Sequence, residues 1–418
     1  MKHVDLSTEQ EQAADMLVEW ARYRSGARGR AGAVGRTDDR VRALRGLAGT
    51  GKTTTGAEVA RRLVALGTRV AVVAPTGKAA HVLRTKGIAA TTIHAAAYRL
   101  IDDGASSPTF ELRPGVQGDP DVVICDEASM ATADHVGDLL SRVPRVLLVG
   151  DPGQLPPVSG QAVLADALGV DLLEVHRQAL DSGVVRFAHA IRAGASVADA
   201  LRAGAPDVVP GRPLHLPGVL LVGRNDLRMR LNTGVRAQVH ANSIAPLGAS
   251  SGRLAPVPWP IVGDRLVCLS NHRKARTDGD DGPYLDDDGR VVEPPDPWCN
   301  GTVGDVTSVP AVSSGRDAGP DAARRFVARC DDGLTRDGQA WLRQLATAEL
   351  LQVGTTPQDR WRRETRFAWG WCLTTHKAQG SEWAEVAVMG DGFGTPDELR
   401  AWRYTAATRA SKKLWWAT

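Results

Sequence analysis

Cysteine and long apolar runs are scarce in this chain of 418 residues. Its five cysteines lie far apart, and no Cys-x-x-Cys pair occurs. Such a set argues against a disulfide framework or a zinc site and favours a reducing cytoplasm. No stretch approaches the roughly 20 apolar residues of a membrane span, and the opening MKHVDLSTEQEQ lacks the apolar core of a secretion signal. We therefore expect a soluble intracellular protein with no membrane partner.

The chain also lacks an excess of charge of either sign, with 51 Lys and Arg against 48 Asp and Glu and a net charge of +3. This balance neither requires nor excludes a nucleic-acid partner, because such proteins often confine their positive charge to one groove. A hydrophobic fraction of 43% and a charged fraction of 24% are ordinary for a globular protein. The length suffices for about two to four domains.

Short apolar runs alternate with helical patterns from about residue 41. The runs are residues 41–44, RVAVVAP, VVICDE and RVLLVGD. Continuous Val, Ile and Leu runs between helices predict a parallel sheet that is covered on both faces. A first helix is predicted over residues 9–20 by the apolar spacing of Ala13, Met16, Leu17 and Trp20. The Arg- and Gly-rich stretch at 22–45 is expected to be a mobile surface insert or, as an alternative, an arm that contacts nucleic acid.

The alternation is interrupted twice. Residues 101–120 read as a hairpin excursion, and residues 250–345 are rich in Pro, Gly and Asp with short β-like segments, which predicts a small inserted β domain. Residues 365–418 return to an α/β pattern that ends with a strand in KKLWW. For Trp369 and Trp371 we expect core packing.

The segment GLAGTGKT at residues 46–53 fits the phosphate-loop pattern G-x-x-x-x-G-K-T. Its glycines let backbone N–H groups turn toward phosphate oxygens, and the following helix adds its positive N-terminal end. Lys52 is predicted to bridge the β- and γ-phosphates, and the Thr53 hydroxyl to ligate Mg²⁺. A strand before the loop and a helix after it make a chance match improbable.

Carboxylates and one glutamine follow the next buried runs. Asp126 is expected to hold the metal and Glu127 to act as the catalytic base that orients the attacking water. Gln154, on the loop DPGQLPPV, is placed to touch the γ-phosphate without adding like-charge repulsion. Taken alone, these residues would read as a solvated acidic strand end; their order after the phosphate loop favours catalysis.

With these motifs the chain resembles superfamily 1 helicases of the RecD-like type, with a compact layout similar to the phage helicase Dda. The resemblance covers most of the chain and is carried by LSTEQ, GLAGTGKT, APTGKAA, TTIHAA, VVICDEASM, VLLVGDPGQLPPV, LLEVHRQ, LTTHKAQGSEW and YTAATRA. It implies an α/β protein with two RecA-like P-loop NTPase domains on parallel sheets. The first would span 1–165 with a hairpin insert at about 99–120, and the second 166–250 and 346–418 with a small SH3-like β insert at 251–345.

The resemblance also implies roles around the nucleotide. Gln10 matches the glutamine that recognises the adenine edge, and Glu382 the residue that contacts the ribose. Arg177 and Arg409 match the two arginines that reach the γ-phosphate from the second domain, where a guanidinium suits the spread charge of phosphoryl transfer. The remaining expected nucleotide contacts come from the phosphate loop and the first turn of its helix: Gly49, Thr50, Gly51, Lys52, Thr53 and Thr54.

Three segments are implied to line a channel for single-stranded DNA. Hydroxyls, amides and Lys suit phosphate contacts, and aromatic rings suit base stacking. The expected contacts are Thr76, Lys78, Thr92, His94, Thr374, His376 and Lys377. For His94 and His376 a role as buried hydrogen-bonding residues stays open. Phe110, in the hairpin excursion, is expected to be a wedge that splits duplex, or else a packing residue.

The leading hypothesis is an ATP- and Mg²⁺-dependent DNA helicase, bacterial or phage-encoded, that moves 5′ to 3′ on single-stranded DNA as a monomer and unwinds forked duplex. The polarity and the choice of DNA rest on the resemblance alone. An alternative is a loader or remodeller that translocates without much unwinding, or the motor of a larger machine with replication or recombination proteins as partners. A P-loop kinase would not need Arg177, Arg409 and TTHKAQG.

Overall fold

The computed structural model describes residues 6–22, 38–102, 109–112, 115–116, 120–241, 260–269, 300–309, 323–331, 335–341, 367–390, 392 and 394–417. The chain divides into two compact units. The first comprises residues 1–103, 107–223 and 374–418, and the second residues 104–106 and 224–373. Most of the Arg- and Gly-rich insert predicted at 22–45 lies outside the described residues. Among the described helices, none is long and apolar enough to cross a membrane.

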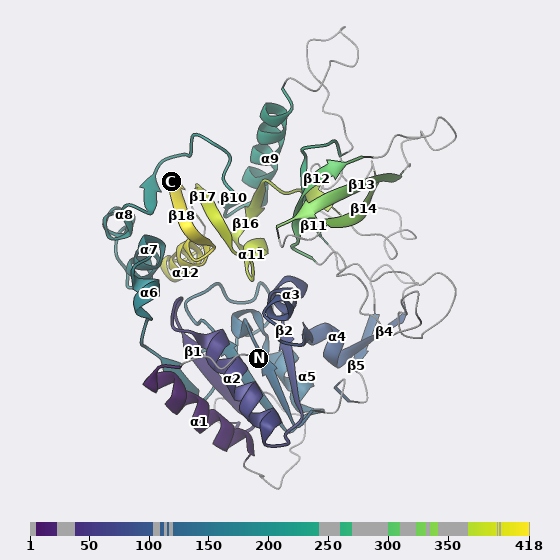
Figure 1. Cartoon of the computed structure of the whole chain (residues 1–418), viewed down its shortest axis with the longest axis vertical. Coiled ribbons are helices and arrows are strands. Elements are labelled where there is room, and N and C mark those ends of the chain that lie inside the picture. The colour runs from purple at the N-terminus through teal and green to yellow at the C-terminus, as the bar shows by residue number, and fades with distance from the viewer. Residues whose placement is uncertain are drawn as a thin grey trace. The chain divides into compact units, whose positions relative to one another are not determined.

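The first unit begins with a six-stranded parallel sheet in the order β3-β2-β6-β7-β1-β8, here called the first sheet (Figure 1). Its strands are β1 (Val41–Gly46), β2 (Val70–Ala74), β3 (Ala90–Thr92), β6 (Val122–Cys125), β7 (Arg145–Gly150) and β8 (Gly169–Leu172). Its helices are α1 (Thr8–Arg22), α2 (Lys52–Ala65), α3 (Gly77–Thr85), α4 (Ile93–Ala97), the short 3₁₀ helix η1 (Ala128–Met130) and α5 (Ala133–Leu140). The parallel pairing agrees with the apolar runs of the sequence.

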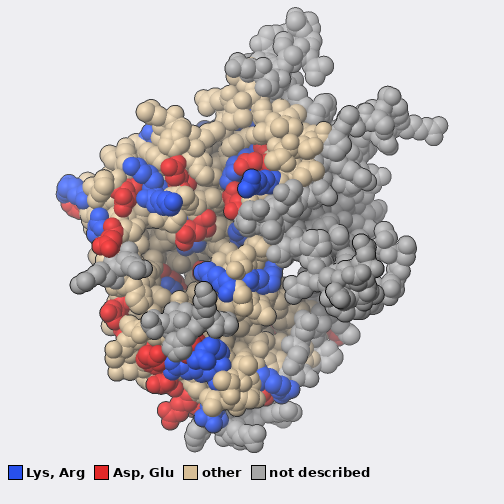
Figure 2. Space-filling model, viewed as in Figure 1, with Lys and Arg blue, Asp and Glu red and all other residues tan. Residues whose placement is uncertain are grey.

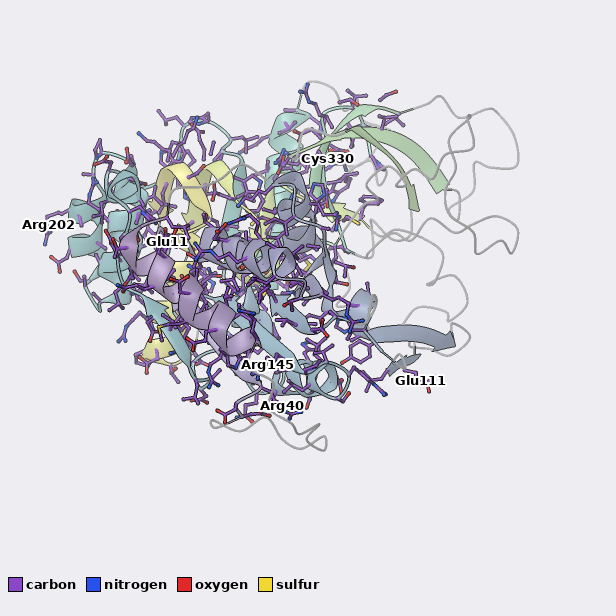
Figure 3. The ribbon with its side chains drawn as sticks, turned by 60° about the horizontal axis from the view of Figure 1, so that its bottom comes forward. Glu11, Arg40, Glu111, Arg145, Arg202 and Cys330 are labelled. Carbon is purple, nitrogen blue, oxygen red and sulfur yellow. The ribbon has the colours of Figure 1, made fainter. Side chains whose placement is uncertain are left out.

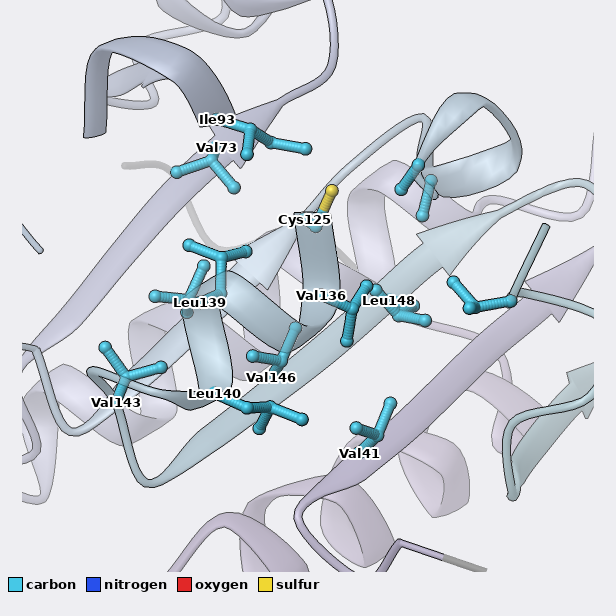
Figure 4. Close-up of a cluster of buried hydrophobic side chains, with 14 of the residues drawn as sticks. Val41, Val73, Ile93, Cys125, Val136, Leu139, Leu140, Val143, Val146 and Leu148 are labelled. Carbon is cyan, nitrogen blue, oxygen red and sulfur yellow. The ribbon is translucent and has the colours of Figure 1, made fainter. Parts of the chain in front are cut away.

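Alternate residues of each strand enter separate cores on the two faces of the first sheet. Along β6, Val122 and Ile124 pack with α1 and α2, whereas Val123 and Cys125 pack with α4 and α5 (Figure 4). A strand that is buried on both faces needs apolar side chains at every position, which explains its continuous Val and Ile run. Each such side chain stabilises the fold by about 1.5–3 kcal/mol when fully buried.

Helix α1 forms where the apolar spacing predicted a helix. Ala13 and Leu17 are buried, whereas Met16 is 58% exposed. The helix packs instead through positions spaced by three and four residues, namely Ala14, Leu17, Val18 and Ala21. Met16 lies about 100° around the helix from Leu17 and therefore faces solvent.

Ion pairs join α1 to α2 on the outside of this layer. Arg62 of α2 pairs with Glu11 and Asp15 of α1 and with Glu58 one turn earlier. Figure 3 shows Glu11 on α1. Hydrogen bonds from Arg61 and Arg62 lower the pKa of Glu58 to about 2. Figure 2 shows the same mixing of charge over the face in view, where Lys and Arg lie among Asp and Glu.

A hairpin leaves the first sheet after α4. Strands β4 (Tyr98–Asp102) and β5 (Thr109–Leu112) pair antiparallel, and Figures 1 and 3 show the hairpin extending from the sheet, with Glu111 on β5. Its base is fixed because the Tyr98 hydroxyl donates to the Asp138 carboxylate on α5, while the His94 ring stacks on Tyr98 with centroids 5.3 Å apart. An antiparallel hairpin was predicted at this place in the chain.

A second sheet has the order β16-β10-β17-β18-β9, and all of it belongs to the first unit except the first two residues of β16. Its strands are β9 (Val208–Pro210), β10 (Val219–Val222), β16 (Cys372–Thr374), β17 (Trp383–Met389) and β18 (Ala410–Ala417). The helices of this part are α6 (Arg177–Leu180), α7 (Gly183–Arg192), α8 (Val197–Gly204), α11 (Thr375–Ala378) and α12 (Pro396–Ala407). Strand β17 pairs parallel with β10 and β18, and β18 pairs parallel with β9; β18 is the strand predicted in KKLWW.

The second unit contains α9 (Asn225–Val239) and an antiparallel sheet in the order β14-β13-β12-β11-β15. Its strands are β11 (Arg265–Cys268), β12 (Val303–Ser308), β13 (Ala323–Cys330), β14 (Thr335–Trp341) and β15 (Phe367–Trp369). The buried carboxylate of Asp264 accepts from Arg236 and pairs with His240, both near the end of α9. Trp369, under the Arg236 guanidinium, and Trp371 are 5% and 6% exposed, which confirms core packing for both.

Candidate nucleotide and nucleic-acid sites

The phosphate loop runs from the end of β1 to the start of α2, as predicted. Gly49 and Gly51 have φ values of 86° and 78°, a left-handed conformation that glycine adopts without strain. A Cβ on Gly51 would stand 2.1 Å from Gln10 Nε2 and 2.9 Å from His176 Nε2, so a larger residue would displace both side chains. The loop therefore has the backbone geometry that turns successive N–H groups toward one point.

Lys52 and Thr53 open α2 beside the carboxylates that follow β6 and β7. Lys52 Nζ donates to Leu47 O at 2.8 Å and lies 3.9 Å from the Asp151 carboxylate. Thr53 Oγ1 donates to Asp126 Oδ2 at 3.2 Å. Burial and the neighbouring Glu127 raise the pKa of Asp126 to about 6. A hydroxyl and a buried carboxylate are oxygen ligands of the kind Mg²⁺ prefers, so these residues fit a magnesium nucleotide.

Glu127 adopts a left-handed backbone conformation with φ 53° and ψ 36°. It is the only non-glycine residue with positive φ in the described part of the chain. Such strain costs on the order of 1–3 kcal/mol and accumulates at active sites. The strained residue lies between β6 and η1, and it is the residue that the sequence predicted to be the catalytic base.

The loop after β7 is held by Asp151. Its Oδ1 accepts the Gly153 N–H at 2.8 Å, and its backbone carbonyl accepts the Gln154 N–H at 3.2 Å. The Gln154 Oε1 atom is buried with no hydrogen-bond partner among the described residues. A buried amide oxygen without a partner is costly in a folded chain. Its environment therefore agrees with a residue that acts on a ligand.

Gln10 lies over the phosphate loop and is 2% exposed. Its Nε2 donates to Thr50 O at 3.1 Å, and its Oε1 accepts the Ser7 N–H at 3.0 Å. The same Nε2 lies 2.7 Å from His176 Nε2. Sequence reasoning missed His176, although its position directly before Arg177 in EVHRQ was a signal.

The two candidate arginines differ in what the structure describes. Arg177 is the first residue of α6, and its side chain lies outside the described residues. Arg409 is 6% exposed and donates to Thr405 O, Ser381 O and Thr408 Oγ1 at 3.0–3.1 Å. Burial and the Asp151 carboxylate raise the pKa of Tyr404, and the positive charge of Arg409 partly offsets this rise. Glu382, the candidate ribose contact, is exposed.

Three side chains near Arg409 bind the loops of the first sheet and were missed by sequence reasoning. The Tyr404 hydroxyl donates to Asp151 Oδ2 at 2.6 Å and accepts the Ala48 N–H at 2.8 Å. Thr405 Oγ1 accepts the Leu155 N–H at 2.8 Å, and Gln379 Nε2 donates to Leu155 O at 3.0 Å. Tyr404 and Thr405 belong to YTAATRA, so the motif that carries Arg409 also contained this signal. The phosphate loop thus contacts the second sheet through α12.

The threonines predicted to contact nucleic acid all begin helices. Thr76 caps α3, Thr92 caps α4 and Thr374 caps α11, each by accepting the N–H three residues later at 3.1–3.4 Å. A cap uses one acceptor site of the hydroxyl, so its proton is still available for a phosphate. Thr76 and Thr92 follow the neighbouring strands β2 and β3. The structure thereby brings two of the predicted segments together.

Among the other candidates for nucleic-acid contact, His94 is exposed, His376 and Lys377 are half-buried, and Phe110 lies in the hairpin. Lys78 is 8% exposed, and burial lowers the pKa of both His94 and His376. The lowered pKa values favour the neutral form of both rings, and their contact with a strand stays a prediction. The backbone of Phe110 pairs with Leu100 in the hairpin, but its side chain is outside the described part. Lys377 donates its N–H to Thr374.

Two protein families match the chain. The family described as AAA domain matches residues 28–206, and the UvrD-like helicase C-terminal domain matches residues 370–416. The ATP-dependent RecD2 DNA helicase of Deinococcus radiodurans is 30% identical over 389 residues, which cover 90% of this chain and 46% of that protein. The RecBCD enzyme subunit RecD of Mycobacterium tuberculosis is 30% identical over 417 residues, with 90% and 66% coverage. The chain belongs to the RecD-like helicases of superfamily 1.

Solved helicase structures share the fold of this RecD-like chain. A structure of two coordinating Pif1 helicases at forked double-stranded DNA aligns with a TM-score of 0.56 at 17% identity, covering 99% of this chain and 92% of that one. The Pif1 helicase from Candida albicans aligns with a TM-score of 0.56 at 18% identity, with 100% and 95% coverage. At this identity the likeness concerns the fold. The chain spans about half the length of the RecD2 relative and 66% of RecD.

Proposed function

We propose that this RecD-like chain is an ATP-dependent DNA helicase that translocates 5′ to 3′ on single-stranded DNA and couples hydrolysis to unwinding of forked duplex. One observation carries the proposal. Side chains of α12, on the second sheet, bind both the phosphate loop and the loop that follows β7 on the first. An ATP site that is completed from a second sheet links hydrolysis to movement of one sheet against the other.

The nucleotide is proposed to bind as ATP with Mg²⁺ on the phosphate loop, with Gln10 at the adenine. Thr53 and Asp126 would hold the metal, which neutralises charge on the phosphates when bound. Lys52 would leave the Leu47 carbonyl to bind the terminal phosphates. Glu127 would orient the attacking water and Gln154 the γ-phosphate, since the Gln154 Oε1 atom is buried without a partner among the described residues.

Arg177 and Arg409 are proposed to stabilise the charge that develops on the transferred phosphoryl group. Both stand on the second-sheet side of the site, and Arg409 follows the end of α12, the helix whose Tyr404 touches the phosphate loop. An arginine finger contributes about 10³–10⁵ in rate in well-studied NTPases. Because the arginines and the phosphate loop belong to different sheets, hydrolysis would depend on the closed arrangement.

Single-stranded DNA is proposed to run over the caps of α3, α4 and α11, where Thr76, Thr92 and Thr374 keep a hydroxyl proton for phosphate. The hairpin β4–β5 would meet the duplex. We propose RecA-like domains at 1–165 and at 166–250 with 346–418, and an SH3-like insert at 251–345. Action as a monomer and in the cytoplasm also belong to this proposal.

A second candidate is a single-strand-dependent ATPase that serves as the motor subunit, loader or remodeller of a recombination machine. It is favoured by the RecD relative, which is named as a subunit of the RecBCD enzyme. Replication or recombination proteins would then be partners of this chain.

The deciding experiment uses forked duplexes that carry only a 5′ or only a 3′ single-stranded tail, together with ATPase rates with and without single-stranded DNA. A 5′-to-3′ helicase unwinds the 5′-tailed substrate and shows strongly stimulated ATPase. Unwinding from the 3′ tail alone would overturn the polarity, and stimulated ATPase without unwinding would favour the motor-subunit alternative. An ATPase that does not respond to DNA would contradict both.

A further inference from the structure

Ala48, in the middle of the phosphate loop, has both backbone polar groups bound by side chains of the second-sheet part. Its N–H donates to the Tyr404 hydroxyl of α12 at 2.8 Å. Its carbonyl lies 3.0 Å from His189 Nε2 of α7. The helices α7 and α12 pack against each other. The backbone of one loop residue is therefore held at two points from the second-sheet part.

A nucleotide could replace the protein partner of the Ala48 N–H but not the partner of the Ala48 carbonyl. A phosphate oxygen is an acceptor, so it competes for the Ala48 N–H and cannot compete for the carbonyl. The group that Tyr404 offers to this N–H is also an oxygen acceptor, because the phenol proton is donated to Asp151 at 2.6 Å. Burial and the Asp151 carboxylate raise the pKa of Tyr404, so the hydroxyl keeps this proton. The hydroxyl oxygen thus stands where a phosphate oxygen would bind.

The position corresponds to the terminal-phosphate end of the loop. The residues next to α2 hold the inner phosphates of a P-loop nucleotide, and Lys reaches the outer ones. Ala48 precedes those residues, and Asp151, which orients Tyr404, lies 3.9 Å from Lys52 Nζ. Lys52 itself donates to the carbonyl of Leu47, the neighbour of Ala48. Both donors for the outer phosphates are therefore satisfied by protein oxygens here.

We propose that Tyr404 is a positioning residue whose hydroxyl oxygen occupies the Ala48 N–H until the terminal phosphate of ATP displaces it. Binding of ATP then breaks the hydrogen bond between Tyr404 of α12 and Ala48 of the phosphate loop, whereas ADP leaves this bond in place. By linkage, a change in α12 that withdraws Tyr404 raises the affinity for ATP by the same factor. The contact would let the second sheet distinguish ATP from ADP.

The inference rests on the proposed ATP site, and its test is the Tyr404→Phe variant of the whole chain. The probes are ADP and the non-hydrolysable analogue AMP-PNP, each titrated with Mg²⁺ by calorimetry. Removing the competing oxygen should raise the ratio of AMP-PNP to ADP affinity about three- to tenfold, the range expected for one hydrogen bond. Thermal unfolding without nucleotide reports any general loss of stability, which by itself would leave the ratio unchanged.

His189→Ala is the matched control. It removes the other second-sheet contact of Ala48 but leaves the N–H bound to Tyr404. The ratio should stay at the wild-type value in His189→Ala. An equal rise in both variants would mean that loosening of the loop is the cause, and an unchanged ratio in Tyr404→Phe would also overturn the inference. Failure of the wild-type chain to bind either nucleotide would instead contradict the proposed function.

Discussion

Gly380 lies directly against Thr76. A Cβ on Gly380 would stand 3.5 Å from Thr76 Oγ1 and 3.3 Å from the Cβ of Ala79, both at the start of α3. Gly380 follows α11 on the second-sheet side and has a φ of 74°. The two segments that are proposed to hold the DNA strand thus touch at a position without a side chain.

Replacement of Gly380 by Ala should lower the stimulation of ATPase by single-stranded DNA several-fold, because the new methyl group tightens this contact. Gly87→Ala is the control, since Gly87 has a φ of 79° but nothing within 4 Å of its Cβ position. Both variants carry a left-handed strain of about 1–2 kcal/mol, so only the contact differs. ATPase titrated with oligo-dT checks the prediction, and equal behaviour of the two variants would contradict it.

Lys52→Ala and Arg409→Ala should each abolish turnover, with a loss of at least about 10³-fold expected for the arginine. They should differ in binding, because Lys52 belongs to the phosphate loop whereas Arg409 is held by Thr405 and Ser381 on the second-sheet side. Equilibrium titration with ATP should show weakened binding in Lys52→Ala and near-normal binding in Arg409→Ala. Normal turnover in Arg409→Ala would remove it from the catalytic residues.

Gln10→Ala should reduce discrimination between ATP and GTP. The Gln10 amide is positioned by Ser7, Thr50 and His176 over Gly51, so its removal deletes an oriented polar contact to the base. One hydrogen bond corresponds to a change of up to about tenfold. The ratio of kcat/KM for ATP and GTP measures it, and an unchanged ratio would assign Gln10 to packing.

Phe110→Ala should lower unwinding of a 5′-tailed fork more than it lowers strand-stimulated ATPase. The reason is its place in the hairpin, where it pairs with Leu100 away from the nucleotide. Parallel measurement of strand separation and phosphate release on the same substrate separates the two effects. Equal losses in both assays would favour a packing role.

Glu58→Gln should make the free energy of unfolding depend less on pH under acidic conditions. The folded pKa of Glu58 is about 2, below its ordinary value of 4.5, because Arg61 and Arg62 bind the carboxylate. Its stabilisation is therefore complete above pH 4.5 and is lost as the pH falls toward 2. Urea unfolding from pH 5 to pH 2 should show a smaller pH dependence in Glu58→Gln. Glu19→Gln, on the exposed side of α1, should follow the wild type.

The sequence predicted those strands, helices and loops whose structure is caused by residues close together in the chain. The Val and Ile run of β6 follows from burial on both faces, and the phosphate loop follows from glycine spacing. Contacts between distant segments leave no such pattern: Tyr404 and Ala48 are 356 residues apart, and nothing in either segment names its partner. Helical spacing likewise predicted α1 but not which side of it meets the sheet, and Met16 is exposed.

The Leu155 backbone offers a way to observe when the contact between the two sheets opens. Its amide hydrogen is covered by Thr405 Oγ1 and its carbonyl by Gln379, although Leu155 belongs to a loop of the first sheet. Deuterium can replace this hydrogen once the Thr405 hydroxyl withdraws. The rate of exchange at the Leu155 amide, measured by mass spectrometry with each nucleotide, would therefore report how often the two sheets separate there.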